Sequence, residues 1–382
     1  MHGFAAMIDD PPVMRLDPGP GEPVRHLLDP ERPTRRPHIE RSAGENGPGS
    51  ARRRGRRGVR NLAVLAGLAG GLMAAVAAAR RLGRDTPPLY RSLRATPRDW
   101  SWGGHRLTYY EAAPAVDAGK VGSGAAAREP VVLVHLIHAA ASAWEMRELF
   151  ARFGAERRVL AYDLLGFGAS DRPDADYDAD LYQELLRGFL REVAGSPADV
   201  VASSLSAAHA LCAAAAEPGL FRSLTLINPT GLLTQAERSG AAGRALQNLL
   251  RTPWLGEALY NLLVSRPSLR CFASRIYRDP ELEEETIGQR YAAAHQPGAR
   301  YAPAAFLGDA LARNTYMALR ALEVPALAVW SPAESLEEQA FMAVAPGIEQ
   351  TVIEDCGALP HEERPEKVAG AIRSFWRGLR RS

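Results

Sequence analysis

From about residue 130 onward, short uninterrupted apolar runs alternate with amphipathic segments, and this alternation restricts the possible folds more than any other feature. The runs include "VVLV", "RVLAY", "ADVVAS" and "SLTLI". Runs of this length without polar interruption are typical of strands that are buried on both faces of a parallel sheet. The segments between them, such as "LYQELLRGFLREVA", have helical periodicity. The pattern predicts an α/β fold built on a mostly parallel, doubly wound sheet.

Two further strand-like runs, "PALAVW" and "EQTVIED", follow a helix-rich stretch at residues 231–316. Ligands of α/β sheets bind beyond the carboxyl ends of the strands, so an insertion at this point would cover the pocket. We therefore predict a core formed by residues 100–230 and 317–380, with a helical cap at 231–316. The apolar residues of the cap suggest a hydrophobic substrate; they are Leu249, Leu250, Trp254, Leu255, Tyr260, Leu262 and Leu263.

The N-terminal part of the chain has a different composition. Residues 1–58 are rich in Pro, Gly, Arg and Asp, and we expect them to be disordered because they offer little apolar surface to bury. Leu62–Ala79 is free of charged residues over 18 positions, so 59–82 is predicted to form a single transmembrane helix. A cleaved secretory signal or an amphipathic helix is the alternative. A slight excess of arginines before this segment favours a globular domain outside the cytoplasm.

The charge and the cysteines exclude other classes of function. The net charge is +2, with a dense arginine run, "ARRRGRRGVR", at 51–60. Nucleic-acid binding is the first interpretation of such a run, but its position beside an apolar segment favours a membrane flank, and no nucleic-acid partner is predicted. Cys212, Cys271 and Cys356 are scattered and odd in number. They fit neither a metal spacing nor a disulfide framework, so no metal or cofactor is predicted. The oligomeric state stays open.

The stretch "ASSLS" at 202–206 joins an apolar run to an Ala-rich helical pattern. A serine nucleophile at such a junction needs a strained turn that exposes its Oγ, together with small neighbours that let the helix pack closely. Ala202 and Ser206 are small, so Ser204 is the candidate nucleophile. The alternative is that Ser204 merely caps the helix that follows.

Several motifs resemble those of the α/β-hydrolase fold family. "DLLGFGASDRP" at 163–173 is similar to the family's D-x-x-G-x-G-x-S loop, and "VLVH" at 132–135 is similar to the strand before its oxyanion loop. The resemblance implies the α/β-hydrolase fold. It also implies an oxyanion hole formed by the amides of Leu205 and Ile137. Leu136 and Ser206 depart from this pattern, because the family usually has glycine at both positions.

The same resemblance implies an acid and a base for Ser204. The family's acid follows the strand that "PALAVW" represents, and Glu334 takes that place here, with Glu337 and Glu338 as neighbouring alternatives. The family's catalytic histidine would fall at Ala358. His361, three residues later, is the candidate base. His138 is a second candidate, and loss of the base is a third possibility.

A narrower resemblance links "HLIHAAASAWEMREL", "HQPGARYAPAAF" and "LPHEERPE" to a bacterial subgroup of α/β-hydrolase-like proteins with no assigned substrate. The unusual residues of these stretches are candidates for lining the pocket. They are His138, His295, Arg300 and Tyr301.

These observations predict a membrane-anchored serine hydrolase that acts on a hydrophobic ester or amide. In this hypothesis Ser204 attacks the acyl carbon, while His361 and Glu334 form the base–acid pair. The alternative is a non-catalytic binding or scaffold protein that keeps the pocket and has lost its base. A dehalogenase is disfavoured, because the turn carries Ser and not Asp, and a peroxidase-like or lyase activity has no specific support. A hydrogen bond from His361 or His138 to Ser204 would favour the enzyme.

Overall fold

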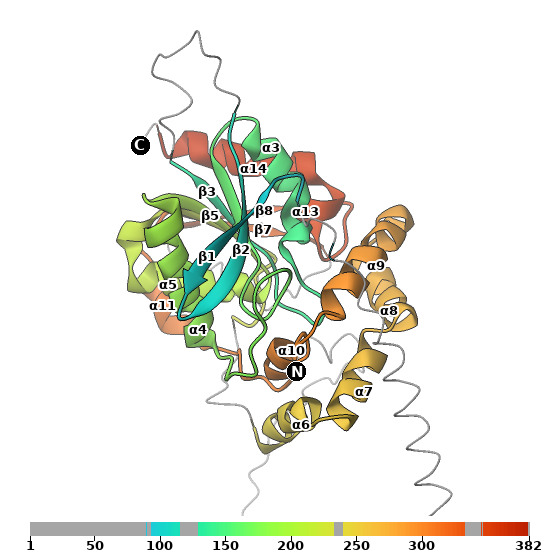
Figure 1. Ribbon diagram of the computed structural model, residues 1–382. Helices are drawn as coiled ribbons and strands as arrows, with labels where there is room; N and C mark the ends of the chain where they lie inside the picture. The colour runs from blue at the N-terminus through green and yellow to red at the C-terminus, as the bar shows by residue number, and fades with distance from the viewer. Residues whose placement is uncertain are drawn as a thin grey trace, which may run out of the picture. The chain divides into compact units, whose positions relative to one another are not determined.

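The computed structural model describes residues 89, 93–114, 129–232, 240–332, 345 and 347–380. Within these ranges the chain forms an eight-stranded sheet in the order β1-β2-β4-β3-β5-β6-β7-β8 (Figure 1). The first two strands pair antiparallel to each other and β2 pairs antiparallel to β4, whereas all pairs from β4 to β8 are parallel. The strands are β1 (Pro97–Trp102), β2 (His105–Ala112), β3 (Val131–Val134), β4 (Val159–Tyr162), β5 (Ala198–Ser203), β6 (Phe221–Ile227), β7 (Ala326–Trp330) and β8 (Ile348–Val352). The predicted mostly parallel α/β sheet is confirmed.

The uninterrupted apolar runs form the central strands. Every residue of β3, β4, β5 and β7 is buried. Such strands need helices on both faces of the sheet to cover them. The strand β1 was not anticipated, because "PRDWSW" mixes polar and aromatic residues; it is mostly exposed and joins β2 through Gly103 and Gly104, both at positive φ.

Helices cover both faces of the sheet (Figure 1). The helices α4 (Ala179–Phe189) and α5 (Leu205–Ala216) pack with α11 (Tyr316–Arg320) on one face. The helices α3 (Arg147–Gly154) and α14 (Pro365–Gly378) cover the other face. Shorter elements are the 3-10 helices η1 (Ala143–Met146) and η3 (Pro218–Leu220), the π-helix η2 (Leu190–Ala194) and the helix α13 (Pro360–Glu363).

Among the described residues, six helices lie between β6 and β7 in the chain, and the first five form one segment. These five are α6 (Ala241–Arg251), α7 (Leu255–Leu263), α8 (Arg266–Ile276), α9 (Pro280–Ala294) and α10 (Tyr301–Leu307), called here the cap. The cap is tied to the core by specific contacts: the Tyr260 hydroxyl donates to Ala139 O at 2.7 Å, and Ala358 N donates to Ile276 O at 2.8 Å.

The described ranges contain no helix that is long and apolar enough to cross a bilayer. The expected disordered segment 1–58 and the expected transmembrane helix 59–82 both lie outside these ranges.

Candidate active site

Ser204 lies in a strained turn between β5 and α5. Its backbone angles are φ 53° and ψ −128°, a region that residues with a side chain rarely occupy. Its N–H donates to Ile227 O at 2.9 Å, which holds the turn against β6. Ala202, two residues earlier, is fully buried in the core. Such strain persists only where the surroundings enforce it, and it typically occurs at functional positions.

The Oγ of Ser204 lies 3.0 Å from Oγ1 of Thr230, in the loop after β6. The side chain of Ser204 makes no capping hydrogen bond to α5, although it precedes that helix directly. Ser204 therefore does not cap α5 with its side chain. Sequence reasoning missed Thr230, because nothing in the run "NPTG" indicates that its hydroxyl would meet a serine 26 positions earlier.

The two expected oxyanion donors follow neighbouring strands at equal offsets. Val134 of β3 pairs with Ala202 of β5, so Ile137 and Leu205 each come three residues after a paired position, at the carboxyl edge of the sheet. Leu205 is the first residue of α5, where backbone N–H groups have no acceptor within the helix. Both residues thus follow strands at the edge of the sheet where an oxyanion hole would form, and their role as donors stays a prediction.

Ser206 stands where the family usually has glycine, and its hydroxyl makes a hydrogen bond that glycine could not make. Its Oγ donates to His135 O at 2.7 Å and so links α5 to the end of β3. The ring of His135 links two more loops: its Nδ1–H donates to Leu136 O at 2.6 Å, and its Nε2 accepts from Leu164 N at 3.1 Å. Burial lowers the pKa of His135, which keeps the ring neutral in this arrangement.

His361 does not contact Ser204. It is completely buried, and its Nε2 lies 2.8 Å from Oε1 of Glu145. Its Nδ1 has no hydrogen-bond partner among the described residues. The other carboxylate oxygen of Glu145 accepts from Leu136 N at 2.7 Å. The expected Ser204–His361 pair is therefore not formed, because His361 follows Pro360 on the first turn of α13 and faces η1.

Glu145 is a site residue that the sequence did not reveal. Burial alone would raise the pKa of this carboxyl, but the hydrogen bond and the charge of His361, with help from His135 and the Leu136 amide, outweigh burial and lower the pKa. The ionised carboxylate holds the first residue of the oxyanion loop from one side and His361 from the other. Its function in the structure is to position that loop.

Ala358, the position at which the resemblance places the family's histidine, is held by backbone hydrogen bonds. Its carbonyl accepts from Nδ2 of Asn228 at 2.8 Å. Asn228 also exchanges two hydrogen bonds of 2.8 Å with Ser331, one through each atom of its amide. One asparagine thus joins the loops that follow β6, β7 and β8. Glu334, together with Glu337 and Glu338, lies outside the described residues.

His138 makes no hydrogen bond to Ser204 either. Its Nδ1 accepts from Ala140 N at 2.8 Å, and it lines a small cavity with Glu145 and Arg290. Burial, followed by the charges of Arg290 and His135, holds the pKa of His138 well below its ordinary value. Neither candidate base therefore reaches the candidate nucleophile.

Of the three expected pocket residues of the cap, His295 and Arg300 lie between α9 and α10, and Tyr301 is the first residue of α10. His295 donates from Nδ1 to Tyr291 O at 2.8 Å and stacks on the Tyr291 ring, while its Nε2 has no hydrogen-bond partner in the described part of the chain. The guanidinium of Arg300 donates to the Tyr301 hydroxyl at 3.1 Å. Tyr301 packs against the core cluster.

A buried group of charges joins the cap to the core beside Glu145. Glu362 is 2% exposed and accepts from the Tyr277 hydroxyl at 2.8 Å. Its carboxylate is also paired with Arg147 of α3 and with Arg290 of α9. A buried carboxylate needs partners of this kind, because an unpaired charge would be strongly destabilising. Glu362 thus joins the cap to the core.

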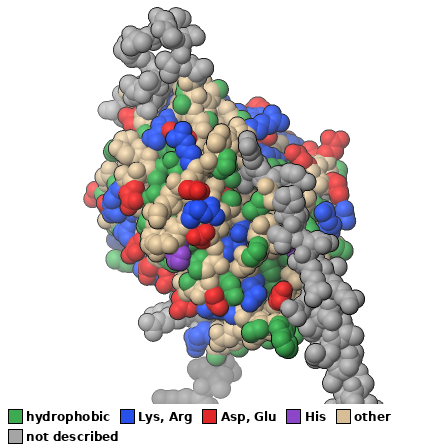
Figure 2. Space-filling model, in the orientation of Figure 1, with side chains coloured by type: hydrophobic (Ala, Val, Ile, Leu, Met, Phe, Trp, Pro, Cys, Tyr) green, Lys and Arg blue, Asp and Glu red, His purple; other side chains and the backbone are tan. Residues whose placement is uncertain are grey.

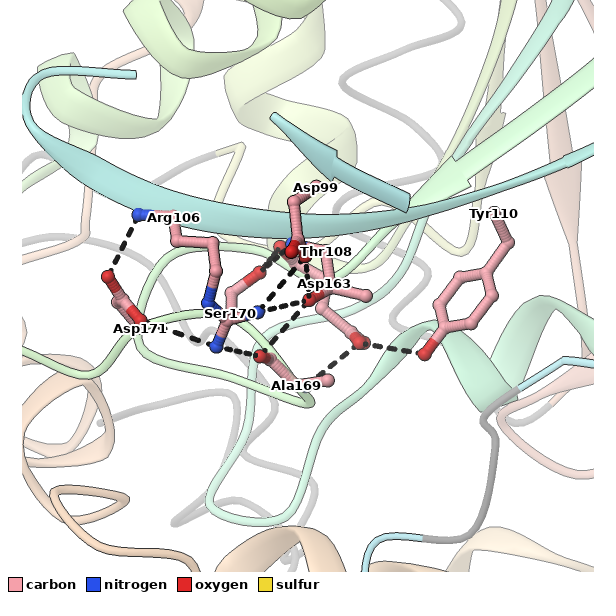
Figure 3. A network of polar contacts seen from close by, with 8 residues as sticks. All are labelled: Asp99, Arg106, Thr108, Tyr110, Asp163, Ala169, Ser170 and Asp171. Carbon is pink, nitrogen blue, oxygen red and sulfur yellow. Dashed lines mark hydrogen bonds and ion pairs between the residues drawn. The ribbon is translucent and has the colours of Figure 1, made fainter. Parts of the chain in front are cut away.

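The loop that follows β4 is organised by Asp163 (Figure 3). Its Oδ1 accepts from Ala143 N at 2.7 Å, and its Oδ2 accepts from Ala169 N at 2.9 Å. The Ser170 hydroxyl donates to Asp163 O at 2.6 Å. Gly168 has φ 51°, and a Cβ there would lie 2.0 Å from the Asp163 carboxyl. The D-x-x-G-x-G-x-S motif is therefore a structural support of the site.

Comparison with known proteins agrees with this geometry. A family model described as the alpha/beta hydrolase family matches residues 131–371. The 2-hydroxymuconate semialdehyde hydrolase of Pseudomonas sp. (strain CF600) is 33% identical over 105 residues, which are 27% of this chain and 37% of that protein. The 2-hydroxy-6-oxo-2,4-heptadienoate hydrolase of Pseudomonas putida is 32% identical over 114 residues, 29% of this chain and 40% of that protein. The matched regions thus span less than half of these relatives.

Solved structures share the fold at lower sequence identity. The 2-hydroxy-6-oxo-6-phenylhexa-2,4-dienoate hydrolase of Rhodococcus sp. strain RHA1 superimposes with a TM-score of 0.59 at 18% identity, covering 74% of this chain and 99% of that one. An epoxide hydrolase gives a TM-score of 0.60 at 20% identity, covering 75% and 100%. With the strained serine turn between β5 and α5 and the family match over residues 131–371, this chain belongs to the α/β-hydrolase family.

Proposed function

We propose that this protein is a serine hydrolase of acyl compounds in which Ser204 attacks the carbonyl carbon and the amides of Leu205 and Ile137 bind the oxyanion. The observation that carries the proposal is the strained backbone at Ser204, combined with an Oγ that does not cap α5. A serine that only began a helix would adopt relaxed angles and bond to that helix. The curated relatives, which are hydrolases by name, point the same way.

The missing base sets the expected rate. The hydroxyl of Thr230, 3.0 Å from Ser204, can accept and donate a hydrogen bond, so it orients Oγ and can pass a proton to water. It is not a base, and a serine without one is a weak nucleophile. Loss of triad function in serine hydrolases still leaves roughly 10³–10⁴-fold catalysis over water, which comes from the oxyanion hole and substrate binding. We therefore propose slow turnover.

A second function is favoured by one observation. Ala358 offers only a methyl group where the family has imidazole, and His361 is bound to Glu145. A protein that binds a carbonyl compound at Ser204 without cleaving it would need no base. The two functions make different predictions for a reactive probe.

The test is covalent labelling of the full chain with a fluorophosphonate probe, located by mass spectrometry. The proposal predicts slow labelling at Ser204 that disappears in Ser204→Ala. It also predicts faster labelling in Ala358→His, which supplies an imidazole at the family position, and not in Ala358→Gln, which adds similar bulk without a base. No labelling of the natural chain, with labelling of Ala358→His, would favour the binding protein. No labelling of either would refute a role for Ser204 as nucleophile.

A further inference from the structure

The hairpin of α6 and α7 in the cap carries an exposed apolar surface. The apolar cap residues that the sequence assigned to substrate binding fall into two groups: Leu250 and Tyr260 are buried, whereas Leu249, Trp254, Leu255 and Leu262 are exposed. The exposed side chains, called the cap stripe, are Leu249, Trp254, Leu255, Leu259 and Leu262. Trp254 is 63% exposed and Leu262 59% exposed. Most of the cap stripe therefore cannot line an internal pocket.

The spacing along α7 places three of these leucines on one side of the helix. Leu255, Leu259 and Leu262 follow each other at intervals of four and three residues, which brings them onto one face. The opposite face of α7 holds Tyr260 and is already packed on the core through Ala139 and Ala140. A surface helix normally presents polar residues on its outer side. An outer face of leucines beside an exposed tryptophan indicates an interaction surface.

Arginines outnumber acidic residues in the helices around the cap stripe, although Arg251 is paired with Asp174 and Asp176, and Arg270 with Glu284. Residues 240–276, which include α6, α7 and α8, contain five arginines and a single acidic residue, Glu257. The arginines are Arg244, Arg251, Arg266, Arg270 and Arg275. In Figure 1 the α6–α7 hairpin lies at the lower end of the view, away from α3 and α14, and Figure 2 shows hydrophobic and basic side chains at this end, with acidic side chains among them.

We propose that the cap stripe docks on a lipid surface that carries anionic headgroups. Tryptophan and leucine insert at the boundary between headgroups and acyl chains, and arginines around them bind lipid phosphates. A basic surface with an apolar stripe is the arrangement that such membranes select.

Charge argues against two other occupants. A second copy of this chain, docked by a two-fold contact, would bring the same arginine-rich helices face to face, so like charges would repel. The apolar segment Leu62–Ala79 of this chain is itself flanked by arginines on both sides, so its flanks would be repelled in the same way. An anionic bilayer is the occupant that complements both the apolar and the basic character of this surface.

The test uses the full chain, and its signal comes from a tryptophan of the cap stripe. Trp254 is the one strongly exposed tryptophan of the described residues, since Trp102 is half-buried and the other four, Trp100, Trp144, Trp330 and Trp376, are buried. Phosphatidylcholine vesicles with and without phosphatidylglycerol are prepared with brominated acyl chains, and quenching of tryptophan fluorescence is measured. Trp254→Phe identifies the share of the signal that belongs to the cap stripe. Because the readout is local, vesicle binding by any other part of the chain does not imitate it.

We expect quenching of Trp254 on vesicles that contain phosphatidylglycerol, and weaker quenching on phosphatidylcholine alone or at high salt. The double variant Leu259→Ser/Leu262→Ser should lower the quenched fraction at least several-fold. Met317→Ser is the matched control, because Met317 is 71% exposed on α11, outside the cap stripe, and its loss should change nothing.

Equal quenching in the natural chain and in Trp254→Phe would overturn the proposal. So would a concentration-dependent dimer that the double leucine variant abolishes, since the surface would then bind a second copy. Ser204→Ala should dock as well as the natural chain, because docking does not depend on the proposed hydrolase activity. Failure of one proposal is thus distinguishable from failure of the other.

Discussion

Nε2 of His361 lies 2.8 Å from Oε1 of Glu145, and this buried pair joins α13 to η1 across 216 positions of the chain. Through the second oxygen of Glu145, the pair also holds the N–H of Leu136 at the start of the oxyanion loop. His361 is therefore a positioning residue for that loop in this structure.

This pairing predicts different results for two substitutions of His361. His361→Ala leaves the Glu145 carboxylate buried without its partner, and we expect a loss of about 3 kcal/mol in the free energy of unfolding. His361→Gln supplies an amide N–H to Glu145, so it should lose clearly less. Urea denaturation measures both. Since glutamine cannot act as a base, the rate of fluorophosphonate labelling at Ser204 should stay within about two-fold of the natural rate in His361→Gln. Loss of labelling in a folded His361→Gln variant would restore His361 as the base.

The strained backbone at Ser204 is expected to lower the stability of the folded protein, so a residue that relieves the strain should raise it. Ser204→Gly and Ser204→Ala both remove the hydroxyl, but only glycine adopts φ 53° and ψ −128° without steric cost. We expect the glycine variant to be more stable than the alanine variant by about 1 kcal/mol. Thermal unfolding of the two proteins side by side tests this, and equal melting temperatures would mean that the turn stores no strain.

The close approach of Gly168 to Asp163 predicts a large effect from one methyl group. Gly168→Ala places a Cβ 2.0 Å from a carboxyl that is already fixed by backbone N–H groups, so we expect a loss of about 3 kcal/mol. Gly195→Ala is the control: its φ is 72°, but the space around it is open, and its cost should be about 1 kcal/mol. Chemical denaturation of both variants gives the comparison. Similar losses in the two variants would mean that the cost of Gly168→Ala comes from the positive φ alone and not from a clash with the Asp163 carboxyl.

The buried ring of His209 should account for part of the stability that the folded protein loses at acidic pH. Burial, only partly offset by the hydrogen bond to Leu311 O, lowers the pKa of this imidazole to about 4 in the folded protein, against an ordinary value of 6.5. Protonation thus favours the unfolded chain: the neutral ring contributes stability above pH 6.5, and this contribution is lost as the pH falls toward 4. Between pH 7.5 and 5 the loss from this residue is about 2 kcal/mol.

Denaturation of the natural chain and of His209→Gln at these two pH values measures that loss. The amide of glutamine can still donate to Leu311 O but does not titrate, so the variant should lose less stability than the natural chain on acidification. His135 and His138, whose pKa values are also lowered by burial, remain in both proteins and provide a common background. Parallel losses in the two proteins would contradict the assignment to His209.

The core strands and the serine turn could be predicted because their signals are local. An apolar run such as "VVLV" specifies a strand buried on both faces, and the change of pattern after Ser203 marks a strand that ends where a helix begins. Two small neighbours of Ser204 complete that signal. The strand β1 carried no such run, because its position at the edge of the sheet lets polar and aromatic residues alternate irregularly.

The partners of the site residues depended on tertiary structure. Thr230 meets Ser204 because β5 and β6 are adjacent in the sheet, and Glu145 meets His361 because η1 and α13 converge near the end of β3. Likewise, the leucines of α7 were assigned to a substrate pocket from composition, but the orientation of the helix on the core turned most of them outward. By itself the sequence determined the fold and the position of the candidate nucleophile, since periodicity and turn chemistry act between near neighbours. Which imidazole faces which carboxylate, and which side of a helix is buried, was decided only when distant segments packed together.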